Sequence, residues 1–146
     1  MMNNSQKSLK HRVERFIRLN SQTREATLRS EQEFLKLAGN ISAAQLHIIL
    51  SVGLIPECTM SQLAIKLHFT QANITQMINR LIEKKFLKRT QSKADKRVFY
   101  ISLLVKGKKI FDLHAEHVER TAREWFSKMT EEEQEGMLQL WEKTFS

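Results

Sequence analysis

The side chains with the clearest chemistry lie between Thr70 and Lys84, in the segment TQANITQMINRLIEK. Apolar residues recur there at i, i+3, i+4 and i+7, the spacing of one buried helix face: Ile74, Met77, Ile78 and Leu81. The rest of this helix, with its N-cap, offers mostly hydrogen-bonding side chains: Thr70, Gln71, Ala72, Asn73, Thr75, Gln76, Asn79 and Arg80. Such groups can bond to base edges, and an α-helix fits the major groove of duplex DNA. The pattern therefore predicts a helix that reads base pairs.

A second group of charged residues occupies the polar loop SKADKR, from Ser92 to Arg97. A guanidinium at the tip of a hairpin can enter a narrow minor groove, where the negative potential is concentrated. Arg97 suits that role, and Asp95, two residues earlier, can hold it in place. Lys93 and Lys96 are expected to lie near phosphates. The alternative is a surface ion pair, which contributes less than about 1 kcal/mol.

Positive charge is concentrated on the middle of the chain. The 146 residues carry a net charge of +8, and residues 59–110 alone hold twelve Lys or Arg against two acidic residues. Residues 111–146 are net negative, with four basic and nine acidic residues. Charge can serve solubility alone. Its coincidence with the base-reading helix instead favours neutralisation of DNA phosphates.

Two other sets of residues could carry chemistry. His114 and His117, one turn apart, could gather a metal ion together with His47; alternatively they line a dimer-side cavity or make ordinary hydrogen bonds. The single cysteine, Cys58, could sense redox state, but a half-buried turn residue is the simpler interpretation. An enzyme acting on nucleic acid has no support, because the chain offers no nucleophile with a partner base, no phosphate-binding Gly loop and no carboxylate cluster.

The elements that position these residues are mostly helical, since the chain has only four Gly and one Pro. Capping patterns at Ser42, Thr59 and Thr70 predict three consecutive helices, the last two forming a helix-turn-helix. Residues 86–91 and 98–103 are rich in strand-forming side chains and predict a β-hairpin, the wing of a winged helix. Helical periodicity then runs to Met129, and Thr130 with Glu133 caps a final helix.

The ends of the chain are expected to assemble two copies. Residues 8–38 predict one long helix, or two in line, while the first seven residues are expected to be frayed. A single helix of that length is about 46 Å long, more than a small domain needs for its own core. Its apolar residues, and those of the last helix, suit a twofold interface: Leu9, Val13, Phe16, Ile17, Leu138, Trp141 and Phe145. A further aromatic stripe, Phe111, Trp125, Trp141 and Phe145, predicts core rather than a ligand cage.

The order of elements from Ser42 to Gly107 resembles the MarR (multiple antibiotic resistance regulator) family of bacterial transcription factors. The resemblance rests on Gln45, the helix from Thr59 to Leu67, Arg80-Leu81, Arg89, and Asp95-Lys96-Arg97, which matches the family's Asp-x-Arg signature. It implies a single domain over residues 1–146, with a winged helix-turn-helix at 42–103 and dimerisation helices mainly at 8–38 and 104–146.

Two departures from the family pattern are visible. The family usually has Gly-Leu before the first wing strand and Leu-Thr-x-x-Gly after the second. This chain has Phe86-Leu87 and Leu103-Leu104-Val105-Lys106-Gly107. Because Phe does not adopt the backbone angles open to Gly, the helix-to-strand turn is expected to differ at Phe86.

These observations together predict a mostly α, winged helix-turn-helix protein that works as a homodimeric, sequence-specific regulator of transcription. We expect a repressor bound to a double-stranded DNA operator and released by a small-molecule effector, with no cofactor and no enzymatic activity. The alternative is a zinc-responsive regulator of the same fold, because His47 and His114 resemble ligands of such family members, although Leu46 and Leu113 stand where acidic neighbours are expected. No secretory signal or membrane span is evident, which predicts a cytoplasmic protein.

Overall fold

The computed structural model describes residues 4–39 and 41–145, and these divide into two units at Asn40. The first unit is one helix, α1, Asn4–Ala38 (35 residues), followed by Gly39 at φ 66°. Residues 4–7 are helical, so the expectation of a frayed start is wrong for them, while Met1 to Asn3 lie outside the described residues. An unbroken run of residues without Gly or Pro lets the helix extend almost to the beginning of the chain.

The second unit begins with three short helices that are held by their caps. They are α2 (Ala43–Leu54), α3 (Met60–Leu67) and α4 (Gln71–Glu83), with N-caps at Ser42, Thr59 and Thr70. The first two caps are complete capping boxes, in which the third helical residue, Gln45 or Gln62, bonds back to the cap backbone. These predicted starts are confirmed because a cap depends only on residues within one helical turn.

The wing is a two-stranded antiparallel hairpin of β1 (Leu87–Gln91) and β2 (Phe99–Leu103), with Arg89 opposite Ile101. Each strand is one residue shorter than predicted. The Phe86 amide closes the turn after α4 by donating to the Leu81 carbonyl (2.9 Å), and the Val98 amide donates to Asp95 within the loop (2.9 Å). The other edge of β2 is anchored by the Ile101 amide, which donates to the Cys58 carbonyl (2.7 Å).

The turn between α4 and β1 differs from its expected form. The left-handed residue is Lys85, at φ 60°, and Phe86 follows it as a buried core residue. The Phe86 carbonyl accepts from the Leu104 amide (2.9 Å), and a Cβ at Gly107 would collide with this same carbonyl. The left-handed residue is therefore Lys85 and not Phe86, because α4 ends in a Schellman cap: the Phe86 amide donates to the Leu81 carbonyl and the Lys85 amide to the Ile82 carbonyl, both at 2.9 Å.

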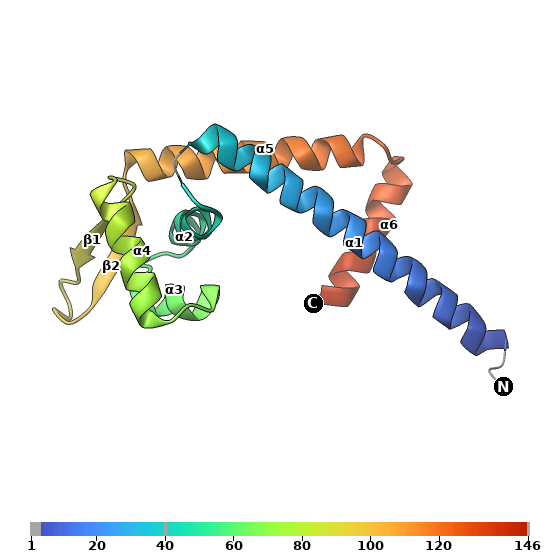
Figure 1. Ribbon diagram of the computed structural model, residues 1–146, viewed down its shortest axis with the longest axis horizontal. Helices are drawn as coiled ribbons and strands as arrows, with labels where there is room; N and C mark the ends of the chain where they lie inside the picture. The colour runs from blue at the N-terminus through green and yellow to red at the C-terminus, as the bar shows by residue number, and fades with distance from the viewer. Residues whose placement is uncertain (1–3, 40, 146) are drawn as a thin grey trace. The chain divides into compact units, whose positions relative to one another are not determined.

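The core of the second unit lies where α2, α3, α4 and the base of the hairpin meet (Figure 1). Its fully buried large side chains come from all of these elements: Leu46, Ile48, Ile49, Leu63, Ile74, Ile78, Leu81, Leu87 and Ile101. Met77, expected on the buried face of α4, is only half-buried. The periodicity of α4 thus predicted three of its four core residues correctly.

Two helices complete the second unit, α5 (Val105–Phe126) and α6 (Glu131–Phe145), joined by a turn that the Thr130–Glu133 capping box closes. The stripe expected to be core is not core within one chain, since Trp125, Trp141 and Phe145 are 38%, 57% and 81% exposed. No residue of α6 is buried. Within the described residues, no single helix is both long and apolar enough to cross a membrane.

Candidate nucleic-acid interface

The polar face of α4 is held outward by the three buried residues on its other side, Ile74, Ile78 and Leu81. Asn73, Gln76, Asn79 and Arg80 are all exposed. Their side chains make no hydrogen bond or ion pair with the rest of the described chain. Four side chains on one face of α4 therefore have unused hydrogen-bond donors and acceptors, which reading base edges requires.

Three other predicted site residues have part of their bonding capacity engaged within the protein. The Thr70 hydroxyl accepts from the Asn73 amide (3.3 Å) as the N-cap. The Gln71 amide donates to the Ser61 hydroxyl (3.2 Å), which joins α3 to α4, and the half-buried Thr75 hydroxyl donates to the Gln71 carbonyl (2.7 Å). These residues orient the helix as well as lining its polar face.

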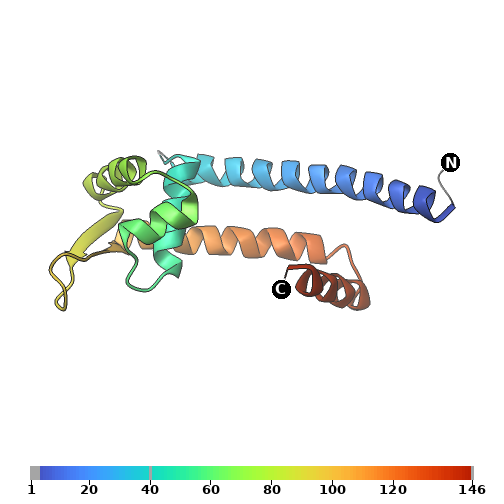
Figure 2. The same ribbon diagram turned by 90° about the horizontal axis from the view of Figure 1, so that it is seen from below.

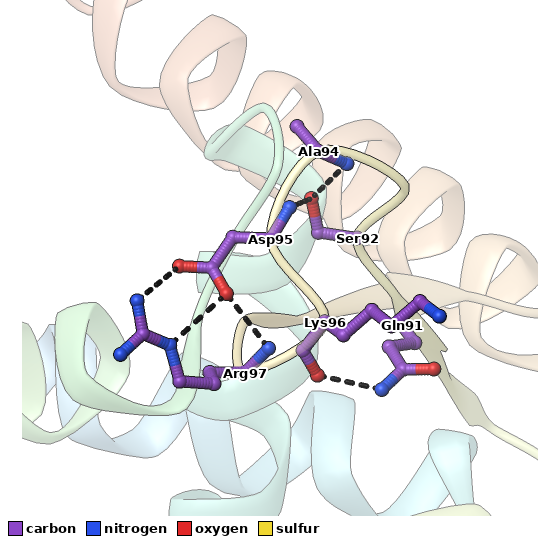
Figure 3. Close-up of polar contacts among 6 residues, drawn as sticks. All are labelled: Gln91, Ser92, Ala94, Asp95, Lys96 and Arg97. Carbon is purple, nitrogen blue, oxygen red and sulfur yellow. Dashed lines mark hydrogen bonds and ion pairs between the residues drawn. The ribbon is translucent and has the colours of Figure 1, made fainter.

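The tip of the wing is ordered by one serine and one carboxylate (Figure 3). The buried Ser92 hydroxyl accepts from the backbone amides of Ala94 and Asp95, both at 3.3 Å. Asp95 Oδ1 accepts from the Arg97 backbone amide (2.9 Å) and from Arg97 Nε (3.3 Å), while Oδ2 accepts from Nη2 (3.4 Å). Asp95 thus fixes both the backbone and the guanidinium of Arg97, the geometry predicted for this pair.

The electrostatics of the tip follow from these bonds. Hydrogen bonds from the Arg97 backbone amide, and then from its side chain, lower the pKa of Asp95 below its usual value. The Arg97 side chain is nevertheless 91% exposed, so its remaining donors point to solvent. Lys93 and Lys96 are exposed too, and the Lys96 carbonyl accepts from the Gln91 side chain (2.6 Å), which ties the loop to β1.

Arg89, in strand β1 of the wing, was not predicted from the sequence as a site residue. The guanidinium carbon of Arg89 lies 3.8 Å from the centroid of the Phe99 ring on the opposite strand. A similar contact at the start of α5 places Lys106 Nζ 4.2 Å from the centroid of the Phe86 ring. Alternation of side chains along the two strands could have predicted which residues share a face with Arg89. Identifying Phe99 as its neighbour also requires the register of β1 with β2, which only the folded hairpin supplies.

The histidines do not gather into a metal centre. His47 lies exposed on α2, and His114 and His117 are half-buried on α5. The described part of the chain contains no group of three or more His, Cys, Asp or Glu side chains placed to hold a metal ion. His117 Nδ1 instead lies 3.0 Å from Arg120 Nη2, an ordinary side-chain contact.

Cys58 is a structural residue of the turn before α3. It is fully buried, and its carbonyl anchors β2. Burial raises the pKa of its thiol, with a smaller opposing effect from Lys66. Because the thiolate is the reactive species, this environment disfavours oxidation chemistry.

A recess of about 460 Å³ opens on the second unit between the end of α2 and β2. Its walls are mostly apolar, with one carboxylate and two hydroxyls among them: Val52, Gly53, Leu54, Ile55, Pro56, Glu57, Tyr100, Ile101, Ser102 and Leu103. The bond from Ile101 to Cys58 lies at its border. A ligand in this recess would therefore touch the segment that anchors the wing.

Comparison with known proteins agrees with this geometry. The sequence profile described as "MarR family" matches residues 41–99. The regulator PchR of Bacillus subtilis (strain 168), named an HTH-type transcriptional regulator, is 28% identical over 142 residues, covering 90% of this chain and 82% of that protein. BilQ of Clostridium symbiosum, named in the same way, is 26% identical over 107 residues, covering 70% of this chain and 72% of that protein.

Solved structures show the same fold. FabT of Streptococcus pneumoniae, solved in complex with DNA, is 28% identical and superposes with a TM-score of 0.71, covering 88% of this chain and 96% of that chain. The reduced form of MarR from E. coli shares the fold with 24% identity and a TM-score of 0.71, covering 88% and 95% of the two chains. The named relatives are regulators, which agrees with a non-enzymatic protein. The chain matches the MarR family profile over residues 41–99 and shares the winged-helix fold of that family's DNA-binding transcriptional regulators.

Proposed function

We propose that the protein binds its operator as a homodimer and represses transcription, with α4 in a major groove and Arg97 in the adjacent minor groove. The observation that carries the proposal is the pairing of two prepared surfaces. One is the unbonded polar row on α4, and the other is the guanidinium that Asp95 holds at the wing tip. A row of amide side chains can discriminate bases, and a positioned guanidinium recognises a narrow groove.

The proposal that two copies assemble draws support from apolar surface on each unit. On α1, Phe16 and Ile17 are 67% and 60% exposed, and on α6 Trp141 and Phe145 are 57% and 81% exposed. Isolated soluble chains rarely leave so many large apolar side chains on consecutive turns in water. Obligate dimer interfaces bury about 2,000 Å² or more and are rich in such residues.

The proposed effector is a small organic molecule that binds the recess beside β2. The volume lies within the roughly 300–1,000 Å³ range of ligand pockets, and mostly apolar walls with a few polar groups are typical of them. A ligand there would act on the wing through the Cys58–Ile101 anchor, so that binding of ligand and of DNA would be thermodynamically coupled. Replacing Ser102, one of the residues that line the recess, with Trp should fill the recess and abolish effector release while DNA binding remains.

The experiment that tests the function begins with the DNA that the purified full-length protein retains from a pool of genomic fragments. Sequencing those fragments should yield an inverted repeat, because a twofold dimer reads two half-sites one helical turn apart. Transcription from a promoter carrying this repeat should fall when the protein is added. Enrichment without a repeat would refute the dimeric arrangement, and increased transcription would refute repression.

A further inference from the structure

The contact between Arg89 and Phe99 has a defined place on the hairpin. In the register of the wing, Arg89 lies opposite Ile101 and Phe99 lies opposite Gln91. Arg89 and Phe99 are thus diagonal neighbours on one face of the two strands, the distance at which long and aromatic side chains meet. Their separation of 3.8 Å between guanidinium carbon and ring centroid is that of direct stacking.

This face is the one that continues into the core. Leu87 and Ile101 belong to it and are fully buried, whereas Arg89 is exposed and Phe99 is half-buried. Lys88, next to Arg89 in sequence, points to the opposite face because side chains alternate along a strand. Arg89 therefore stands on the helix-facing side of the hairpin, just beyond the point where the hairpin leaves the core.

Arg89 is the middle residue of β1 and so lies, along the chain, between the end of α4 at Glu83 and the wing-tip loop at residues 92–97. In Figures 1 and 2 the hairpin lies beside α4 and extends beyond the helices. A helix in a major groove and a wing tip in the next minor groove are separated by one sugar-phosphate strand, which must pass the surface between them. Arg89 is the cation of the wing stem on that surface.

The chemistry of the pair suits a phosphate. A guanidinium stacked on a ring is restrained in orientation, yet keeps its in-plane N–H groups for a bidentate acceptor. No acidic side chain among the described residues pairs with Arg89. We propose that Arg89, oriented by stacking on Phe99, binds a backbone phosphate between the two grooves and so sets the position of the wing on DNA. This inference rests on the proposed placement of α4 and the wing.

The test is a double-mutant cycle in DNA affinity measured on the full chain. Arg89→Ala should weaken operator binding roughly tenfold or more, the usual loss for a charged hydrogen bond, and should reduce the salt slope by about 0.9 for each protomer. Phe99→Leu should weaken binding several-fold when Arg89 is present and should have no effect when residue 89 is Ala. Equal effects of Phe99→Leu in both backgrounds would overturn the proposal.

Conservative variants separate orientation from charge and from folding. Phe99→Tyr keeps the ring and should bind like the wild type, whereas Arg89→Lys keeps the charge but loses the planar fork and should bind more weakly. Lys88→Ala removes the same charge from the opposite face and should change the salt slope by less than half as much. Wild-type affinity for Arg89→Lys, or an equal slope change for Lys88→Ala, would show that charge alone matters.

Loss of folding and failure of the wider proposal each have their own readout. Thermal unfolding of each variant identifies any loss of affinity that is caused by loss of folded protein, and Phe99→Tyr reports on the ring even if Phe99→Leu is unstable. If Arg97→Ala leaves groove recognition intact while the Arg89–Phe99 cycle still shows coupling, the minor-groove role of the tip is wrong and the phosphate contact stands. If the Arg89–Phe99 cycle shows no coupling while Arg97→Ala loses groove recognition, the phosphate contact is wrong and the minor-groove role of the tip stands.

Discussion

At the tip of the wing, one carboxylate accepts from two parts of the same residue. Asp95 bonds the backbone amide of Arg97 and also its guanidinium, and these bonds close a loop whose base is the buried Ser92. The arrangement restrains Arg97 without burying it, so the charge stays exposed to solvent. Lys93 and Lys96 flank it and are expected to contact phosphates only through their charge.

The first prediction separates Arg97 from its lysine neighbours. Arg97→Ala should selectively weaken operators with A·T-rich flanks, whose narrow minor groove attracts a guanidinium. Asp95→Ala should give a smaller version of the same defect, since the charge remains but is no longer oriented. Titrations on A·T-flanked and G·C-flanked operators measure both effects. As a control, Lys93→Ala should weaken all sites alike and lower the salt slope by about one; the same pattern from Arg97→Ala would disprove groove insertion.

The pH dependence of the tip follows from the lowered pKa of Asp95. A carboxylate whose folded pKa is depressed contributes stability above its unfolded pKa, near 3.9, and this contribution is lost as pH falls through the lower folded value. Loop order should therefore be constant from neutral pH down to about 4. An NMR titration of the Asp95 carboxyl carbon should give a midpoint below the ordinary value. Arg97→Ala should restore it only in part, because the backbone amide remains; full restoration would contradict this account.

A backbone prediction concerns Lys85, a non-glycine residue in the left-handed region at φ 60°. That conformation costs an ordinary residue about 1–2 kcal/mol, part of which Gly avoids, although Gly also gives a more flexible unfolded chain. Lys85→Gly should therefore raise the free energy of unfolding by up to about 1 kcal/mol in urea titrations. Lys85→Ala is the matched control, removing the same charge without relieving strain. Equal effects of the two changes would show that the strain is negligible.

At the scale of elements, the two faces of α4 differ in what they contact. Ile74, Ile78 and Leu81 fix it against the core, and Asn73, Gln76, Asn79 and Arg80 remain unbonded. The Gln71 amide also donates to the Ser61 hydroxyl of α3, which links the two helices of the helix-turn-helix. Specificity should therefore belong to the unbonded row, whereas Thr70, Gln71 and Thr75 should contribute more to orientation.

Replacing Gln76 or Arg80 with Ala is expected to flatten the preference among operator variants. Each good side-chain contact separates right from wrong bases by about 1–3 kcal/mol, so the loss should appear at one or two base positions of each half-site. Competition binding across a library of single-base operator variants measures it. Glu83→Ala, exposed at the last residue of the same helix, serves as the control and should keep the preference. A uniform loss on every sequence would mean that Gln76 and Arg80 only contact the backbone.

At the scale of the whole molecule, large apolar side chains remain exposed on two helices, α1 and α6. The large apolar residues of α6 are exposed, and those in the first half of α1 are exposed as well. The start of α6 is nevertheless well defined, because the Thr130–Glu133 capping box closes it. These exposed apolar residues are the reason for proposing a dimer.

The assembly prediction is that the intact protein sediments as a dimer at micromolar concentration. Phe16→Glu should shift it toward monomer, because a carboxylate would enter the apolar stripe of α1 and lose its hydration. Gln22→Glu places the same charge on the opposite face of the helix and should leave the dimer intact. Sedimentation of the wild type as a monomer would rule out the proposed assembly.

Some features of this protein depend only on residues within one helical turn of each other. The sequence by itself determined these features. The three capped helices, the buried stripe of α4 and the Asp95–Arg97 pair belong to this class, because a cap, a periodic face and a two-residue turn involve only near neighbours. Membership of the winged-helix class followed from their order.

Other features depend on segments far apart in the chain, and only the tertiary structure decided them. Gly107 of α5 packs so closely on the Phe86 carbonyl that a Cβ there would collide with it, a contact between segments about twenty residues apart in the chain. Arg89 meets Phe99 because the hairpin register places them diagonally. Trp141 and Phe145 are not core because burial depends on what an apolar face meets, and periodicity reports only that such a face exists.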